Sequence, residues 1–396
     1  MPSSLESDPA VYLDHAATTH PFDDVLEAEE DVSRQRFGNP SSQHRFGAAA
    51  RHLLEDAREF LRGSLGAARL VFTSGGTEAD LLGIVGAAAA RAPGRVLVAA
   101  SDHPAVLATR APLALRRHEL CELPVTPHGD LEPERLFDAL GRDVRVVSIL
   151  HGHNELGTLA RLDELVGTVR HVAPDAHVHV DLVQSYGKVD FDLDLAGVDS
   201  VAISGHKLHG PRGIGALALS STAKLAPLQL GGGQEDGLRG GTENVPGAVG
   251  LARAAERMLT QMRPNATHTA ALATRFVSAL QQEFGDLERL GHPERRLPHL
   301  LSLRIPGVVG QTLQERCDAR GIAFSTGSAC HDGAAGDNHV LRAIGLSSRE
   351  AREVVRISFA CDTTPADCDR AVAVLIDEVE TLRALAPSRA DERLRP

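Results

Sequence analysis

Short apolar runs alternate with longer helical patterns over most of the chain. Seven such runs predict β-strands, at residues 69–73, 95–99, 119–125, 144–150, 177–181, 198–204 and 214–219. The stretches between them predict helices, for example at 77–91, 104–115, 133–140 and 162–172. Several strands are apolar at consecutive positions, which is expected when both faces of a sheet are covered. The alternation predicts an α/β fold with a mostly parallel seven-stranded sheet covered by helices.

The pattern changes after the last of these strands. Residues 246–284 form one long Ala- and Leu-rich helical pattern, which we expect to be interrupted near Pro264. A strand at 299–305, a helix at 310–319, a glycine-rich loop, a strand at 354–359 and a helix at 365–385 follow. We therefore predict an N-terminal segment (1–20), a large α/β domain (21–255) and a smaller α+β C-terminal domain (256–396).

Composition narrows the class of protein. The 396 residues are 42% hydrophobic and 24% charged, which is ordinary for a globular protein. A net charge of −12 argues against binding nucleic acid or an anionic membrane through bulk electrostatics. The N-terminus does not resemble a signal peptide, and no apolar run is long enough to span a bilayer. Five cysteines without a CxxC pair indicate a reducing compartment, so we expect a cytoplasmic protein without a cysteine-rich metal site.

The chain has only three lysines, which limits any chemistry that needs an amine. Lys207 follows a strand directly and lies in the glycine-rich segment SGHKLHGPRG, where poor solvation would lower its pKa and favour a Schiff base. Lys188 and Lys224 lie in polar turns and are predicted to be solvated. The alternative for Lys207 is an ordinary exposed loop lysine.

A strand runs into a helix through the glycine-containing segment FTSGGTEAD (72–80). Glycines at a helix N-terminus can bind phosphate through backbone N–H groups. The alternative is a simple turn in which Thr77 caps the helix and Asp80 completes an imperfect capping box. The spacing matches neither the Walker A motif nor GxGxxG, so it does not indicate an ATPase or a nicotinamide enzyme.

Asp181 ends a predicted strand, the position at which open α/β sheets contact ligands. A carboxylate there can keep a pyridine nitrogen protonated. A second interpretation is open, because His177 and His179 alternate with Asp181 on one strand face, and His151 and His153 form another HxH pair. Histidines of this kind bind metals in hydrolases.

Two further residues stand out in the C-terminal part. Cys330 lies in the small-residue loop STGSACHDGAAGDN, where an exposed thiol is expected to be used for its reactivity. Arg356 is a lone base in the apolar strand VVRISF, so its burial requires an anionic partner. Either a substrate carboxylate or an Asp or Glu of the chain could supply that charge.

Taken in order, these segments resemble the cysteine desulfurases, pyridoxal-phosphate enzymes of fold type I in the class V aminotransferase superfamily. Matching stretches cover nearly the whole chain: YLDHAATT (12–19), GNPSSQH (38–44), FTSGGTEAD (72–80), NELGT (154–158), HVDLVQS (179–185), SGHKLHGPRGIGAL (204–217), GGGQEDGLRGGTEN (231–244), STGSAC (325–330) and VLRAIGL (340–346). Their combination in this order is highly specific.

The resemblance implies a cofactor, pyridoxal 5′-phosphate, and a role for each matching residue. Lys207 would carry it, Asp181 would pair with its ring nitrogen, and Gln184 would contact its ring hydroxyl. His103 would stack on the ring and count among the catalytic residues. The phosphate would be held by Gly76, Thr77, Ser204 and His206, and by Thr242 from the partner subunit of a homodimer.

The resemblance also implies the reaction. Asn154, Arg356 and Asn39 would bind the substrate L-cysteine, which becomes L-alanine. The catalytic residue Cys330 would take the sulfur as a persulfide and pass it to an acceptor or scaffold protein for iron–sulfur cluster or other thio-cofactor synthesis. No metal is implied.

Two related activities stay open, since the loop after Cys330 is unusually acidic and glycine-rich. Selenocysteine lyases share most of these motifs, including GGGQE and GTEN, so L-selenocysteine is an alternative substrate. A class V aminotransferase is the other alternative within the superfamily.

Overall fold

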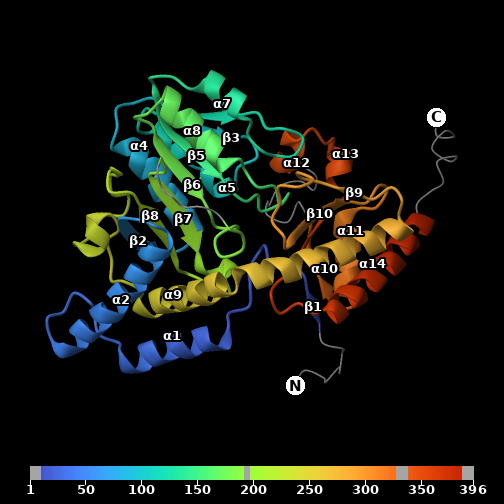
Figure 1. The fold of residues 1–396 in the computed structure, drawn as a ribbon, viewed down its shortest axis with the longest axis horizontal. Helices are drawn as coiled ribbons and strands as arrows, with labels where there is room; N and C mark the ends of the chain where they lie inside the picture. The colour runs from blue at the N-terminus through green and yellow to red at the C-terminus, as the bar shows by residue number, and fades with distance from the viewer. Residues whose placement is uncertain (1–9, 191–196, 327–337, 386–396) are drawn as a thin grey trace.

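The computed structural model describes residues 10–190, 197–326 and 338–385 of the chain. In Figure 1, a large sheet wrapped by helices lies beside a smaller sheet with its own helices, and two consecutive long helices run along both.

The large sheet contains the seven predicted strands. Their order across the sheet is β2 (Arg69–Thr73), β8 (Gly215–Leu219), β7 (Ser200–Ser204), β6 (His177–Asp181), β5 (Val144–Leu150), β3 (Arg95–Ala99) and β4 (Glu119–Leu123). Within this sheet β8 is antiparallel to both neighbours, and the other six strands share one direction. The prediction of a mostly parallel seven-stranded sheet is therefore confirmed.

Helices cover both faces of the large sheet. One face packs against α1 (Asp23–Gln35), α2 (Arg45–Ser64), α7 (Pro133–Ala139), α8 (Leu162–Val172) and α9 (Val245–Thr260). The other packs against α3 (Gly76–Leu81), the π-helical turn η1 (Leu82–Gly86), α4 (Ala87–Ala89), α5 (Pro104–Leu107) and α6 (Arg110–Ala114). Strand β2 illustrates why consecutive positions are apolar: Leu70 and Phe72 enter the first core, and Val71 enters the second.

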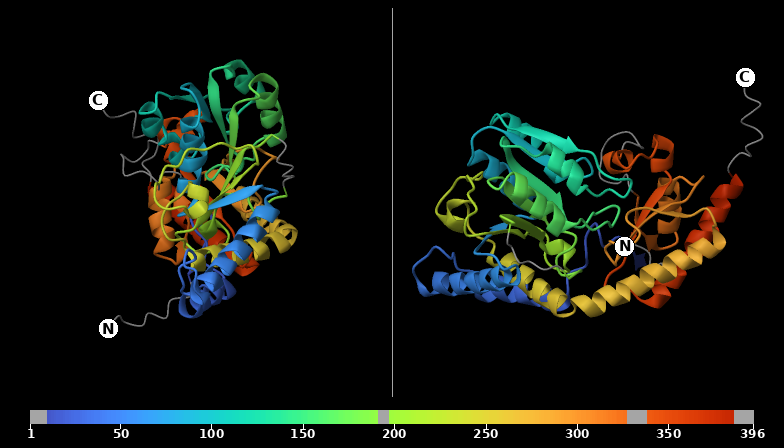
Figure 2. Two further views of the ribbon diagram at one scale, coloured as in Figure 1. Left: turned by 90° about the vertical axis from the view of Figure 1, so that its left-hand side faces the viewer. Right: turned by 45° about the horizontal axis from the view of Figure 1, so that its top comes forward.

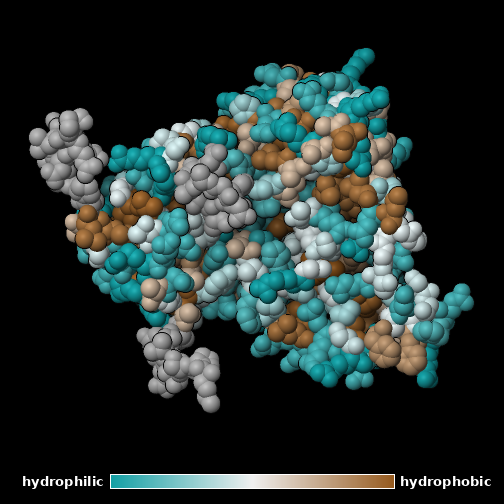
Figure 3. Space-filling model, turned by 180° about the vertical axis from the view of Figure 1, so that it is seen from behind, coloured by the Kyte–Doolittle hydropathy of each residue, from teal (hydrophilic) through white to brown (hydrophobic). Residues whose placement is uncertain are grey.

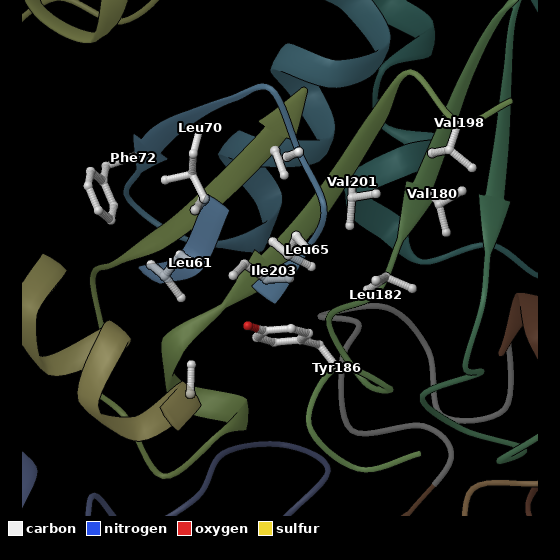
Figure 4. Close-up of a cluster of buried hydrophobic side chains, with 14 of the residues drawn as sticks. Leu61, Leu65, Leu70, Phe72, Val180, Leu182, Tyr186, Val198, Val201 and Ile203 are labelled. Carbon is white, nitrogen blue, oxygen red and sulfur yellow. The ribbon is translucent and has the colours of Figure 1, made fainter. Parts of the chain in front are cut away.

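Figure 4 shows part of the first core, where the ring of Tyr186 lies near Leu65 and Ile203. Tyr186 is the more buried of the chain's two tyrosines, with 1% of its surface exposed. Its hydroxyl lies 2.6 Å from Ser64 Oγ of α2, so the one polar atom of the ring is satisfied inside an apolar cluster. This contact fixes α2 to the loop that follows β6.

The predicted helix at 246–284 is broken near the expected place. Helix α9 ends at Thr260 and α10 (Met262–Glu283) begins two residues later, so the interruption expected near Pro264 is present, and it lies at Gln261. Pro264 lies in the first turn of α10, where a proline removes no intrahelical hydrogen bond. The predicted helices at 77–91 and 104–115 are each divided into shorter pieces.

The smaller sheet is antiparallel. Its order is β12 (Ser325–Thr326), β13 (Val354–Ser358), β10 (Leu300–Arg304) and β9 (Glu288–Arg289). Its core includes residues of α10, α11 (Gly310–Asp318) and α14 (Pro365–Leu385), and Figure 2 shows α10 and α14 side by side. Two short helices, α12 (His339–Ala343) and α13 (Ser348–Ala351), complete this region.

The start of the chain joins the smaller sheet's region. Strand β1 (Val11–Tyr12) pairs in parallel with β11 (Ile322–Ala323), and Val11 and Leu13 belong to that core. The pairing was not predicted, because a two-residue strand leaves no periodic signal. The proposed division at residues 20 and 255 remains a prediction, and α9 runs across the second of these boundaries.

The surface is mostly polar. Figure 3 shows hydrophobic side chains on the rear face in several separate patches among polar ones. The most exposed large apolar side chains of the described residues include Leu115, Leu230 and Phe37. Among the helices that the structure describes, none has the length and apolarity needed to span a bilayer.

Candidate active site

Several of the predicted site residues lie at one edge of the large sheet. Strands β2, β3, β5, β6 and β7 run in one direction, so their carboxyl ends lie along the same edge. Gly76, His103 and Asn154 follow three of these ends, and Asp181 and Ser204 are the last residues of β6 and β7. Ligands of open α/β sheets bind at this edge.

Lys207 lies in the 3₁₀ turn η2 (Gly205–Lys207) that follows β7, and its charge acts on both His103 and Asp181. Its Nζ donates hydrogen bonds to the carbonyl oxygens of Ala16 (2.6 Å) and Ala17 (2.7 Å). Gln184 Nε2 donates to the same Ala16 oxygen at 2.8 Å. The N-terminal segment thus brings Lys207 and Gln184 together.

Lys188 contradicts its prediction. It is buried, and its Nζ has no hydrogen-bond partner among the described residues, so the expectation of a solvated surface lysine was wrong. Burial, with the nearby charge of Lys207, lowers its pKa to about 7. The turn after Tyr186 directs this side chain into a cavity lined by His15 and His299 rather than outward. Lys224 is exposed, as predicted.

Asp181 ends β6 and is buried. Its Oδ1 accepts a hydrogen bond of 2.8 Å from the backbone N–H of Val183. Burial, followed by the proximity of Asp80, raises the pKa of the Asp181 carboxyl to about 8. A cationic partner would reverse this shift and keep the carboxylate ionised.

The glycine segment after β2 packs tightly against the loop after β6. A Cβ on Gly76 would lie 2.8 Å from Val183 Cγ2 and 3.5 Å from Ser204 Cβ, so any side chain there would force Val183 to shift. Ser204 Oγ is buried and has no hydrogen-bond partner within the described part of the chain. The half-buried His206 places Nδ1 3.2 Å from Thr18 Oγ1.

The alternative helix-cap interpretation of this segment was wrong. Helix α3 begins at Gly76 with Gly75 as its N-cap residue, and Thr77 is exposed inside its first turn. Asp80 is buried and lies against His179, with 3.1 Å between Oδ1 and Nε2. Its carboxylate therefore faces the sheet rather than the helix end.

His103 follows β3 and caps α5, its Nδ1 accepting a hydrogen bond of 3.1 Å from the Ala105 N–H. Burial and the charge of Lys207 lower its pKa to about 4. The ring is therefore neutral at physiological pH. A neutral, flat imidazole is suited to stacking on an aromatic cofactor.

Arg356 projects from β13 of the smaller sheet and forms an ion pair of 2.8 Å from Nη2 to Asp14 Oδ1. Its Nη1 donates to the backbone oxygen of Asn154 at 3.1 Å. Its Nε and Asn154 Oδ1 are buried without partners among the described residues. The alternative of a carboxylate partner within the chain is thus confirmed, and the Nε edge of the guanidinium has no partner among the described residues.

For three of the predicted site residues, the structure gives no contact with the other residues of the site. Thr242 and Asn39 are exposed, and Asn39 Oδ1 accepts a hydrogen bond from Ser41 N. Cys330 lies outside the described residues.

The HxH pairs do not support the metal-hydrolase alternative. His177 and His179 both hydrogen-bond Ser200 Oγ, at 2.7 and 2.8 Å. His151 lies 2.9 Å from Ser185 Oγ, and His153 lies 3.0 Å from the Ser101 oxygen. Within the described residues, neither pair belongs to a group of ligand atoms close enough to hold a metal.

Sequence reasoning missed the part played by the N-terminal segment. Asp14, Ala16 and Ala17 contact Arg356 and Lys207 from far away in the sequence. The motif YLDHAATT was noticed, but two of these contacts use backbone carbonyls, for which side-chain identity gives no signal.

Comparisons with known proteins agree with this geometry. A family model for class-V aminotransferases matches residues 11–371. The cysteine desulfurase IscS of Dictyoglomus turgidum is 34% identical over 388 residues, covering 97% of this chain and 98% of that protein. A solved NifS-like protein matches with a TM-score of 0.87 at 33% identity, over 94% of this chain and 100% of the other. The structure of SspA in complex with cysteine matches with a TM-score of 0.77 at 31% identity, over 89% of this chain and 99% of the other.

Proposed function

Because this chain belongs to the cysteine desulfurase family of the class-V aminotransferases, we propose that Lys207 holds pyridoxal 5′-phosphate and that Cys330 accepts the sulfur of L-cysteine. The chain is a pyridoxal-phosphate-dependent cysteine desulfurase. The proposal concerns which residues do this work. The observation that carries it is the group of buried polar atoms without described partners around Lys207.

The residues present fit the cofactor. Ser204 Oγ is a buried hydroxyl without a described partner, beside a glycine loop in which a Cβ would force Val183 to shift, as a phosphate site requires. Gln184 Nε2 is bonded to Ala16, which leaves the buried Oε1 to accept a hydrogen bond from a ring hydroxyl. Burial disfavours the ionised form of the Asp181 carboxyl, and the positive charge of a protonated pyridine nitrogen would stabilise it.

The bound cofactor supplies an electron sink that weakens the bonds at the α-carbon of an amino acid. Lys207 Nζ, released from it by the substrate, would take the α-proton as a general base, and the carbonyls of Ala16 and Ala17 orient this amine. Asp181 would hold a proton on the pyridine nitrogen. The neutral ring of His103 would cover one face of the cofactor.

Residues from both sheets would orient the substrate. Arg356 Nε of the smaller sheet and Asn154 Oδ1 after β5 of the large sheet are buried atoms without partners among the described residues, and the guanidinium attracts a carboxylate. Asp14 holds the guanidinium through Nη2, so the fork is fixed before the substrate arrives. We assign Asn39 to the substrate only through the family resemblance.

The sulfur leaves through Cys330. Its thiolate would attack the substrate sulfur, forming an S–S bond as the C–S bond breaks. The electron pair of the broken bond would stay with the carbon skeleton, which would take up a proton and leave as L-alanine. The persulfide would then pass to an acceptor or scaffold protein for iron–sulfur cluster or other thio-cofactor synthesis. We place this exchange in the cytoplasm, where thiols stay reduced.

We propose that the enzyme is a homodimer in which Thr242 reaches the phosphate of the partner subunit. The support is that Thr242 is exposed on its own chain and that nearby Leu230 is 82% exposed. Exposed apolar side chains of this size are favourable at interfaces.

Visible absorbance and product assays test the assignments. We expect the protein to be yellow, Lys207→Ala to be colourless, and the exposed-lysine control Lys224→Ala to keep its colour. Cys330→Ala should stay yellow and lose release of alanine and sulfide from cysteine, whereas Cys121→Ala should retain it. Full cysteine turnover by Cys330→Ala would contradict the role of this thiol.

The same preparation separates the related activities. Faster turnover of L-selenocysteine than of L-cysteine, independent of Cys330, would identify a selenocysteine lyase. Conversion of keto acids to amino acids would identify an aminotransferase.

A further inference from the structure

A second group of reactive side chains lies outside the residues assigned to cofactor and substrate. His209 follows the turn that carries Lys207, and Cys361 and Asp362 follow the end of β13. One ligand atom from each lies within 4.8 Å of the other two. His209 Nε2 and Cys361 Sγ are 3.8 Å apart.

The environment of His209 fixes which nitrogen faces the cysteine. Its Nδ1 lies 2.8 Å from the backbone oxygen of His20, and a carbonyl oxygen only accepts hydrogen bonds. Nδ1 must therefore carry the proton, which leaves a lone pair on Nε2 in the neutral ring. Metal-binding histidines are oriented in this way, by a hydrogen bond from the other nitrogen to a carbonyl or carboxylate.

The ring is also held in place. Phe22 stacks on it with centroids 4.4 Å apart and planes at 11°. The backbone N–H of His209 donates to Thr19 Oγ1 at 2.7 Å. Nε2 is thus pre-positioned toward Cys361 rather than free to rotate away.

The separation of His209 Nε2 and Cys361 Sγ matches a tetrahedral metal site. Bond lengths of about 2.3 Å to sulfur and about 2.0–2.2 Å to nitrogen or oxygen place ligand atoms roughly 3.3–3.8 Å apart. The observed distance between Nε2 and Sγ is already in this range. The Asp362 carboxylate is exposed and can close the remaining gap by rotating its side chain.

Charge and ligand type select the metal. A thiolate, a neutral imidazole and a carboxylate carry two negative charges, which a divalent cation balances. Two basic side chains act electrostatically on this cluster: Lys188, whose pKa is lowered to about 7 by burial, and Arg257, which is paired with Asp24 at 2.9 Å. Mixed sulfur, nitrogen and oxygen ligands suit zinc, whereas calcium and magnesium require oxygen ligands.

We propose that His209, Cys361 and Asp362 bind one divalent cation of the zinc class, with water as the fourth ligand. An open pocket of about 430 Å³, lined in part by His20, Cys361 and Asp362, gives ion and water access. The bound ion joins the loop after Lys207 to the strand end beyond Arg356. It therefore fastens the smaller sheet's region to the large sheet beside the active site.

Metal analysis of the holoenzyme tests the proposal. Cys330→Ser serves as the parent, because it removes the reactive loop thiol as a competing ligand. After incubation with zinc sulfate and exhaustive dialysis, we expect about one zinc ion per chain, with one sulfur at about 2.3 Å in the X-ray absorption spectrum. Adding Cys361→Ala or His209→Ala should lower the retained zinc at least about tenfold.

The matched control is Cys121→Ala in the same parent, which should retain zinc. Asp362→Asn is an exposed, isosteric change that will not prevent folding, and it should weaken zinc affinity about tenfold. Absence of stoichiometric zinc in the parent, equal retention in Cys361→Ala, or an absorption spectrum without a sulfur ligand would each overturn the site in favour of a simple Cys–His contact.

Discussion

The ion pair between Arg356 and Asp14 provides the sharpest test of the substrate side of the site. Asp14→Asn keeps the shape of the side chain and removes its charge. The pair is 2.8 Å long, and the side chains are 8% and 20% exposed. Arg356 would then be buried without a carboxylate until a substrate arrives.

The magnitude follows from this geometry. Two unit charges about 4 Å apart attract by about 4 kcal/mol at an effective dielectric constant of about 20. Desolvation of the pair offsets part of this attraction, and an asparagine oxygen still accepts a weaker hydrogen bond from Nη2. We expect Asp14→Asn to lower the free energy of unfolding by about 1–3 kcal/mol.

The substrate's carboxylate should restore part of this loss. Urea unfolding followed by circular dichroism, with and without saturating L-alanine, measures the effect. Because Arg356 lacks a charge partner in the variant, L-alanine should stabilise Asp14→Asn more than the unchanged enzyme. In Arg356→Gln this additional stabilisation should disappear. Equal stabilisation of both proteins by L-alanine would refute the assignment of Arg356 to the carboxylate.

The remaining predictions use buried groups and a close approach. Lys188 has a pKa lowered to about 7 in the fold, so its burial is destabilising below that pH and the penalty fades as pH rises toward 10.5. Lys188→Met should therefore raise the melting temperature most near pH 7 and less near pH 9.5. The exposed control Lys224→Met should change the melting temperature equally at both pH values. A pH-independent change in Lys188→Met would contradict the prediction. Gly76→Ala places Cβ 2.8 Å from a valine methyl carbon and should weaken cofactor retention at least about tenfold in equilibrium dialysis. The control Gly63→Ala meets no atom within 4 Å, so it should retain the cofactor and stabilise α2 by about 0.5–1 kcal/mol. Unchanged retention in Gly76→Ala would count against the phosphate site. Tyr186→Phe removes a buried hydrogen bond and should lower the free energy of unfolding by about 1 kcal/mol in urea titrations, and no loss would show that this bond is energetically neutral.

Most of the large sheet could be predicted from the sequence. The strand at 95–99 has the predicted bounds, because a parallel strand buried on both faces is apolar at consecutive positions, here Val96 to Ala99. The break between α9 and α10 could be placed only approximately, since proline is tolerated in a first helical turn and so lies after the break rather than at it.

Some residues of the candidate site could be predicted from the sequence, and others could not. Asp181 and Lys207 could be found from strand ends and from the scarcity of lysine. The burial of Lys188 could not be found, because a lysine in a polar turn carries no local sign of the cavity into which it points. The cluster of His209 and Cys361 escaped as well, since its residues are far apart in the sequence and show no metal-ligand spacing.

The sequence by itself therefore determined the strands of the large sheet, the residues at their ends and the family to which the chain belongs. These depend on hydrophobic periodicity and on motifs that are local in the chain. Only the tertiary structure decided that Asp14 pairs with Arg356, that the Ala16 and Ala17 carbonyls hold Lys207, and that His209 faces Cys361. Such contacts join positions more than 150 residues apart, and their formation depends on how the two sheets pack rather than on any local pattern.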